Sequence, residues 1–286
     1  MGRISPGLLF ALPALIVLTM LIAYPVMYTG LLSVTDQQGN FVGIDNFQRV
    51  LGARTTPIAF TNTLWWVGGS VVLQVILGTA TAILLNEKFP GRGILRSIAV
   101  IPWVVPGIVA ALTWAWMFHT EFGIINYMLT APGIIDEPVG WLTNPDTVMP
   151  AMIAINVWKL FPVVSIMVLA GLQSIPKDLY EAARVDGSNF LDETWHVTLP
   201  QVRPVIVAVT LLLVIWALNH ITTIYAITRG GPANLTLIAP IQIFRLAFES
   251  VQFNQAAALS VLFFAAVMVI VAIYIKVSSA REEKAL

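Results

Sequence analysis

The sequence predicts an all-α fold: a polytopic membrane bundle of six transmembrane helices with both termini in the cytoplasm. Three observations predict it. Hydrophobic residues make up 58% of the 286 residues and charged residues only 10%, whereas soluble domains contain about 45–50% apolar and about 25% charged residues. Six stretches are long enough to cross the hydrocarbon core, which takes roughly 20 mostly apolar residues. The lysines and arginines gather in alternate connections between these stretches.

Each of the six stretches is interpreted as a retained transmembrane helix. The first continues well past the length of a signal-peptide core and lacks a small-residue cleavage site before the next polar segment. Pro102 and Pro106 interrupt the third, which is tolerated where a membrane helix packs on a neighbour or lines a polar cavity. The predicted spans are Leu8–Val34, Asn62–Leu85, Ile98–Phe118, Met149–Gly171, Val205–Ile227 and Ala256–Lys276.

The distribution of basic residues orients the bundle. Ten of the fifteen lie in the N-terminus, the 86–97 and 172–204 connections and the C-terminal tail. Because Lys and Arg mark the cytoplasmic side, both termini should be cytoplasmic. We divide the chain into a first transmembrane helix with its outer segment over residues 1–60, a transmembrane core over 61–276 and a cytoplasmic tail over 277–286.

The residue inventory excludes several classes of function. Lys and Arg together number 15, as do Asp and Glu, so the formal net charge is zero. A chain without excess positive charge does not attract a nucleic-acid backbone, and we expect no nucleic-acid partner. Cysteine is absent, which excludes thiolate nucleophiles and cysteine-ligated metals. The three histidines are dispersed along the chain. We therefore expect neither catalytic residues nor a metal site.

The cytoplasmic connection over residues 173–203 is too long and too patterned to be a plain link. Pro176 falls in the first turn of a helix, and Gly187 suits the position just after its end. An amphipathic helix lying on the membrane surface is the alternative interpretation. Such a helix usually carries Lys and Arg on its polar face, whereas this segment has five acidic residues and three basic ones.

A second short helix follows directly. It should start at Ser188 or Asn189, with Asp192 completing a partial capping box. It should run to Leu199 and stop at Pro200. Two short helices that meet at a glycine would form a compact projection on the cytoplasmic face, hereafter the cytoplasmic knob (residues 173–203).

The knob carries a family resemblance. A spaced motif in the knob resembles the EAA motif of ABC importer permeases. It consists of Glu181-Ala182-Ala183, then Gly187, and after nine further residues Val197-Thr198-Leu199-Pro200, with Val197 in place of the usual isoleucine. The segment from Gly171 to Pro176 resembles the corresponding segment of permeases in the carbohydrate-uptake branch of this family, whose members take up maltose, other sugars or glycerol phosphate. Thr228-Arg229-Gly230-Gly231-Pro232 resembles a segment of the first of the two permeases in such systems.

The resemblance implies the role of the knob and its partners. The knob would dock into a cleft on a cytoplasmic ATPase through Glu181, Ala182, Ala183, Asp186 and Gly187. This chain has no phosphate-binding loop of its own, so it would not be an enzyme and would hold no cofactor, with ATP and Mg²⁺ on an ATPase subunit dimer. A second permease subunit would complete a heterotetramer in the cytoplasmic (inner) membrane of a bacterium or archaeon. An extracytoplasmic solute-binding protein would deliver the substrate.

Ionisable residues within the spans are candidates for substrate contact because their insertion is costly. Lys159 and His220 are two such residues, and if both face one cavity they favour an anionic sugar. Related permeases contact substrate from the third, fourth and fifth spans. By position, that resemblance implies Trp103, Asn156, Lys159, Trp216, Asn219 and His220. The alternatives are packing or interface-belt roles for the aromatic residues, interhelical hydrogen bonds for the asparagines and an ammonium that reaches the outer interface for Lys159.

A different class of transporter is the main alternative. An ion-coupled secondary transporter would need carboxylates within the membrane or inverted repeats. No Asp or Glu lies clearly within the six predicted spans, and no internal repeat is visible. The sequence therefore favours the permease subunit of an ATP-driven, binding-protein-dependent importer of a sugar or sugar derivative.

Overall fold

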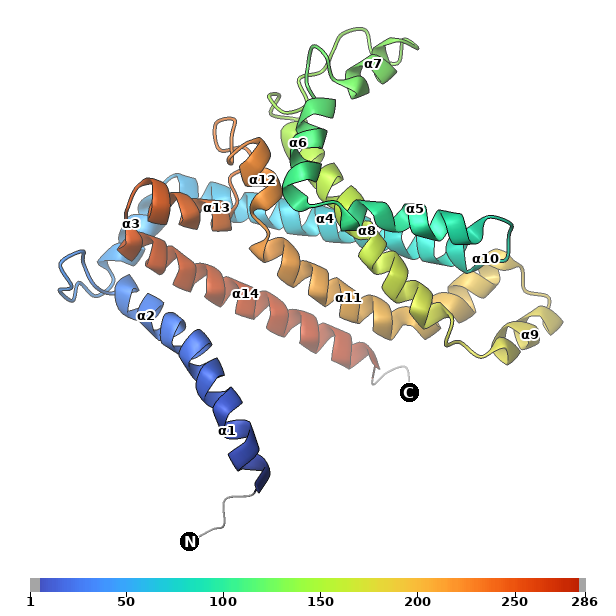
Figure 1. Ribbon diagram of the computed structural model, residues 1–286, viewed down its shortest axis with the longest axis horizontal. Coiled ribbons are helices and arrows are strands. Elements are labelled where there is room, and N and C mark those ends of the chain that lie inside the picture. Colours follow the sequence, from blue (N-terminus) through green and yellow to red (C-terminus); the bar gives the residue numbers. More distant parts are fainter. Residues whose placement is uncertain (1–5, 283–286) are drawn as a thin grey trace. The chain divides into compact units, whose positions relative to one another are not determined.

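The structure, a computed structural model, describes the backbone of residues 6–282 and the side chains of residues 10–276 (Figure 1). Within that part of the chain, all regular secondary-structure elements are helices. One isolated β-bridge joins Thr35 to Phe41. The predicted all-α fold is confirmed. The chain forms two compact units, one built from residues up to Pro57 together with Ala239–Ile270, the other from Ile58–Ile238 and the residues from Val271 onward.

The first unit contains the N-terminal span. A π-helical turn over Thr19–Ala23 joins α1 to α2, and together they form an apolar span over Phe10–Ser33. The helices that lie wholly or mostly within this unit are α1 (Pro6–Leu18), α2 (Tyr24–Ser33), α3 (Asp45–Gly52), α13 (Ala239–Phe244) with its π-helical turn Arg245–Glu249, and α14 (Phe253–Glu282).

Two buried asparagines close the end of α2. The last carbonyls of a helix lack partners within the helix and need them elsewhere. Asn46 of α3 donates through Nδ2 to the carbonyl oxygens of Ser33 at 3.1 Å and Thr35 at 2.8 Å. Asn254 of α14 donates through Nδ2 to those of Thr35 at 2.8 Å and Leu32 at 3.1 Å. The two amides thus tie α2 to α3 and α14.

Replacing Asn254 by leucine should destabilise the protein by about 1–3 kcal/mol, because it leaves buried carbonyls without their donor. Thermal unfolding of the detergent-solubilised protein measures the effect. Gln255→Leu is the matched control, since Gln255 is the next residue and is only half-buried. Equal melting temperatures for the two variants would show that the Asn254 amide contributes nothing.

The second unit contains the central part of the chain. Its helix α8 packs against α5, α6, α11 and α12. Two glycines bring α4 close to α8, since a Cβ atom on Gly78 would lie 2.8 Å from the Phe161 carbonyl oxygen and one on Gly69 would lie 2.8 Å from Ile153 Cδ1. The helices are α4 (Thr55–Asn86), α5 (Arg92–Val104), α6 (Gly107–Met117), α7 (Ile124–Thr130), α8 (Val148–Leu172), α9 (Lys177–Val185), α10 (Phe190–Glu193), α11 (Leu199–Asn219) and α12 (Thr222–Ile227).

The apolar helices confirm a polytopic membrane bundle. Five are long and apolar enough to cross a membrane, and a sixth span arises if the bent pair α5 and α6 is counted as one. These two helices meet at an angle of 95°, at the place where Pro102 and Pro106 are predicted to interrupt the third span. The five are Phe10–Ser33, Thr55–Asn86, Val148–Leu172, Phe190–Ile227 and Phe253–Lys276.

One predicted boundary is wrong. The second helix of the knob does not stop at Pro200: α10 continues through a π-helical turn over Thr194–Thr198 into α11. The wider turn is closed by the Leu199 N–H bonding to the Thr194 carbonyl, and Pro200 follows in the first turn of α11, where a missing N–H is tolerated. The fifth span runs over Phe190–Ile227 and contains the predicted Val205–Ile227, and its backbone becomes extended at His220, between α11 and α12.

Candidate functional site

The first helix of the cytoplasmic knob, α9, has a defined end. Gly187 adopts a φ of +83° just after it, as predicted for this glycine. The Gly187 N–H bonds to the Arg184 carbonyl at 3.1 Å, and the Ser188 N–H bonds to the Ala183 carbonyl at 3.0 Å. This pair of bonds is the Schellman motif, which satisfies the last carbonyls of a helix and requires a left-handed residue. The turn between the two knob helices is therefore fixed by the backbone.

The second helix, α10, starts with the predicted capping box. Asn189 Oδ1 accepts hydrogen bonds from the N–H groups of Leu191 at 2.9 Å and Asp192 at 3.1 Å. In return, Asp192 Oδ2 accepts one from the Asn189 N–H at 3.2 Å. The box satisfies donors that the start of a helix otherwise leaves unpaired.

Side chains then join the two helices. Arg184 of α9 pairs with Glu193 of α10, with Nε to Oε1 at 2.7 Å and Nη2 to Oε2 at 3.2 Å. The hydrogen bond to Glu193 and its negative charge hold the pKa of Arg184 above its usual range. The Tyr180 hydroxyl lies 3.1 Å from Thr198 Oγ1. Because Thr198 directly precedes α11, the knob is attached firmly to the helix that follows it.

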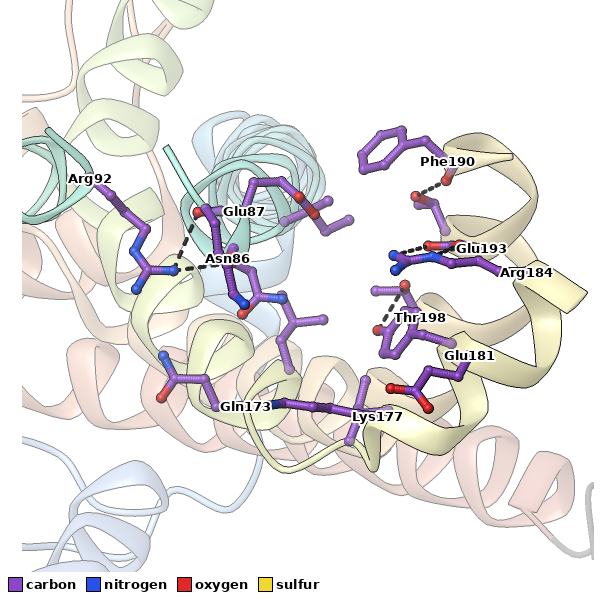
Figure 2. A pocket seen from close by; sticks show the side chains of 16 residues that line it. Asn86, Glu87, Arg92, Gln173, Lys177, Glu181, Arg184, Phe190, Glu193 and Thr198 are labelled. Carbon is purple, nitrogen blue, oxygen red and sulfur yellow. Dashed lines mark hydrogen bonds and ion pairs between the residues drawn. The ribbon is translucent and has the colours of Figure 1, made fainter. Parts of the chain in front are cut away.

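A cavity of about 800 Å³ lies between the knob and the C-terminal end of α4, which ends at Asn86. Figure 2 shows Glu181, Arg184 and Phe190 on the knob side and Asn86 and Glu87 on the opposite side. The Arg92 guanidinium donates to the carbonyl oxygens of Asn86 at 3.2 Å and Glu87 at 3.3 Å, which stabilises the end of α4. The sixteen lining residues include both acids and bases, so the cavity has no dominant charge.

The predicted ATPase-coupling residues lie together on α9 and at its end. Four of them are exposed, and Ala183 is half-buried; the exposed ones are Glu181, Ala182, Asp186 and Gly187. Two exposed apolar residues that are not among the predicted coupling residues accompany them: Val185 is 87% exposed, and Leu191 is 64% exposed. An apolar residue in a run of charged ones was the available signal. Such side chains beside free charges are typical of a protein-binding surface.

The predicted substrate-contact residues gather only in part, around the breaks in the third and fifth spans. A Cβ atom on Gly107 would lie 3.9 Å from Thr222 Cγ2, so the two breaks adjoin. Trp103 is 46% exposed at the first break, and the Lys159 ammonium donates to its carbonyl oxygen at 3.1 Å. His220 stands at the second break, with Nε2 3.5 Å from Thr223 Oγ1.

The other three predicted contacts are placed less favourably. Asn156 is fully buried, and its carbonyl oxygen accepts a hydrogen bond from Gln74 Nε2 at 3.0 Å. Asn219 donates to the Ile215 carbonyl oxygen of its own helix at 2.8 Å. Trp216 is 37% exposed. The substrate role of all six residues stays a prediction.

The capped knob and the bundle of broken apolar helices agree with a membrane transport subunit, the class that the sequence resemblance implies. The chain belongs to the family of binding-protein-dependent transport system inner membrane components, which matches residues 74–282. Family membership confirms the predicted permease class and its multi-pass location in the inner membrane, and it leaves the ion-coupled alternative without support.

Particular relatives are similar along almost the whole chain. The trehalose/maltose transport system permease protein MalF of Thermococcus litoralis is 36% identical over 282 residues, covering 97% of this chain and 95% of the relative. The sulfoquinovosyl glycerol transport system permease protein SmoG of Agrobacterium fabrum is 32% identical, with 98% and 92% covered.

A solved structure shares the fold. It is a bacterial ABC transporter involved in the import of the acidic polysaccharide alginate, and the matching chain has a TM-score of 0.82 at 25% identity, with 96% of each chain covered.

Proposed function

We propose that this chain is a permease subunit of an ATP-driven importer of a sugar or sugar derivative, and that the cytoplasmic knob docks onto an ATPase subunit. One observation carries the proposal: the knob is continuous with the fifth span, since α10, the π-helical turn and α11 form one helix from Phe190 to Asn219. At 1.5 Å per residue this helix is about 45 Å long, enough to cross the hydrocarbon core.

The connection gives a route for coupling. A displacement of α9 would be passed to α10 through the Arg184–Glu193 pair and to the base of α11 through Tyr180 and Thr198. Packed helices move as rigid elements, and α11 packs on α8 and ends at the break beside His220. Closure of an ATPase dimer with ATP and Mg²⁺ bound would thereby reach the predicted substrate residues.

The proposed substrate class follows from the relatives and from the exposed indoles. The names of both relatives refer to carbohydrate or carbohydrate-derived substrates: trehalose/maltose for one and sulfoquinovosyl glycerol for the other. Trp103 and Trp216 offer flat faces that suit the C–H surfaces of sugar rings, and the amides and imidazole predicted beside them suit hydroxyl groups. The hypothesis of an anionic sugar depends on the charges of Lys159 and His220, and the Lys159 protons are already engaged by backbone carbonyls.

The proposed assembly adds three partners: a second permease subunit, an ATPase dimer and an extracytoplasmic solute-binding protein. No residue in the apolar window of the first span is buried inside this chain. Lipid or a partner subunit would have to cover that surface.

Reconstitution of the complex in lipid vesicles tests the proposal. The chain, its partner permease and the ATPase subunits should co-purify, and ATP hydrolysis should rise when the binding protein is loaded with its cognate sugar. Maltose, trehalose and alginate oligosaccharides are the first candidates, each compared with the unloaded binding protein. A chain that purifies alone and transports a solute without an ATPase would overturn the proposal.

A further inference from the structure

The bend in the third span leaves main-chain carbonyl oxygens without their usual partners. In an α-helix the carbonyl of residue i accepts from the N–H of residue i+4. For Pro102 that residue is Pro106, which has no N–H. For Trp103 it is Gly107, which already belongs to α6, beyond a bend of 95°. Unpaired carbonyls at membrane depth are strongly unfavourable unless another group donates to them.

Lys159 satisfies these carbonyls from a different helix. Its Nζ donates to the carbonyl oxygens of Pro102 at 3.3 Å and Trp103 at 3.1 Å, and also to that of Val105. An ammonium has three protons, and the bend supplies three acceptors. The positive charge also lies at the C-terminus of α5, where the helix dipole favours a cation.

The alternative roles of Lys159 need an ammonium that is free to bind elsewhere. A direct ligand would point a proton at the sugar, and a side chain that reaches the interface would be solvated there. Lys159 is half-buried and enters no salt bridge with a carboxylate in the described part of the chain. Its three donors are instead directed at one short segment of backbone.

We infer that Lys159 is a positioning residue: by holding the carbonyls of Pro102, Trp103 and Val105, it fixes the bend between α5 and α6 and thereby the place of the Trp103 indole. This rests on the proposed function, in which Trp103 contacts the sugar. The effect extends to the second break, because α6 packs against α12 and Gly107 lies beside Thr222.

Distance measurement across the bend tests the inference. The chain has no cysteine, so spin labels can be attached at Ile98→Cys on α5 and Leu112→Cys on α6, which are 53% and 57% exposed. Pulsed electron paramagnetic resonance is recorded on the complete complex with Lys159, Lys159→Arg and Lys159→Met. Methionine has a similar length but no donor, whereas arginine keeps both charge and donors.

The inference predicts a shifted and broader distance distribution for Lys159→Met and a distribution close to wild type for Lys159→Arg. Uptake by Lys159→Met should fall by about tenfold through the maximum rate, by the same factor for a neutral and an anionic sugar. An unchanged distribution, or a loss confined to the affinity for an anionic sugar, would overturn it. If Lys159→Met fails to assemble, Lys159→Gln replaces it: the amide is uncharged and its side chain is shorter, so the distance distribution should shift in the same direction but by less.

The result is separable from the proposed function. Lys159→Met should still bind the ATPase subunits, because the knob lies outside the bend. Failure of the wild-type chain to bind an ATPase would contradict the proposed function, and the distance prediction would then be tested on the detergent-solubilised chain with the same two outcomes.

Discussion

Replacing Glu181 by lysine should leave the protein folded and inserted yet reduce uptake by about tenfold or more, within the range of coupling between two sites. The carboxylate is exposed on α9, at the rim of the knob cavity, and none of the hydrogen bonds or salt bridges described for this chain involves it. Within the knob, its negative charge acts on Arg184 more weakly than that of Glu193 does, so its removal takes little support from the knob. A reversed charge at the centre of a docking surface, by contrast, repels a complementary partner.

Uptake into membrane vesicles and co-purification with the ATPase subunits measure this effect. Glu137→Lys is the matched control, with the same charge change on an exposed residue of the 119–148 connection. It should retain both uptake and ATPase binding. Normal uptake by Glu181→Lys would show that this face of α9 is not the docking surface.

Replacing Gly187 by valine should produce a comparable loss of uptake for a different reason. Gly187 has a φ of +83°, and a Cβ atom there would meet no atom within 4 Å. The defect is therefore conformational rather than steric, and a left-handed residue with a Cβ costs about 1–2 kcal/mol, more for a β-branched one. The Schellman bonds of Gly187 and Ser188 would be lost, so α9 would leave its position relative to α10.

The control for this variant carries the same strain at a distant place. Gly133 has a φ of +75° and similarly open surroundings, in the 119–148 connection. Gly133→Val should keep ATPase binding and most of the uptake, while Gly187→Val loses both. Equal uptake by the two variants would mean that the geometry of the knob turn does not matter for coupling.

Local signals allowed much of the knob to be predicted from the sequence. The capping box of Asn189 and Asp192 and the left-handed Gly187 depend on residues within a few positions of each other, and such short-range rules depend little on tertiary context. The continuation past Pro200 was missed because a proline usually stops a helix, and the π-helical turn that accommodates it has no comparable sequence signal.

Long-range contacts explain what else was missed. Lys159 could be singled out as a charge within a span, but its partners lie 54 to 57 residues away and become acceptors only because the third span bends. The Arg184–Glu193 pair joins residues nine positions apart. Opposite charges on two helices joined by a turn indicate such a pair only when the geometry of the turn is known. The sequence alone therefore did not predict the Arg184–Glu193 pair.

Site-specific cross-linking tests the central claim most directly, since the cysteine-free chain accepts a single reporter without background. Val185 at the end of α9 is 87% exposed, and Ile134 in the 119–148 connection is 67% exposed. Each is replaced by cysteine, and the purified chain is labelled with a benzophenone maleimide before it is assembled with its partners and illuminated. The account predicts an adduct with the ATPase subunit from position 185 and none from position 134. Absence of that adduct from position 185 in a complex that transports sugar would contradict the claim that the knob docks on the ATPase.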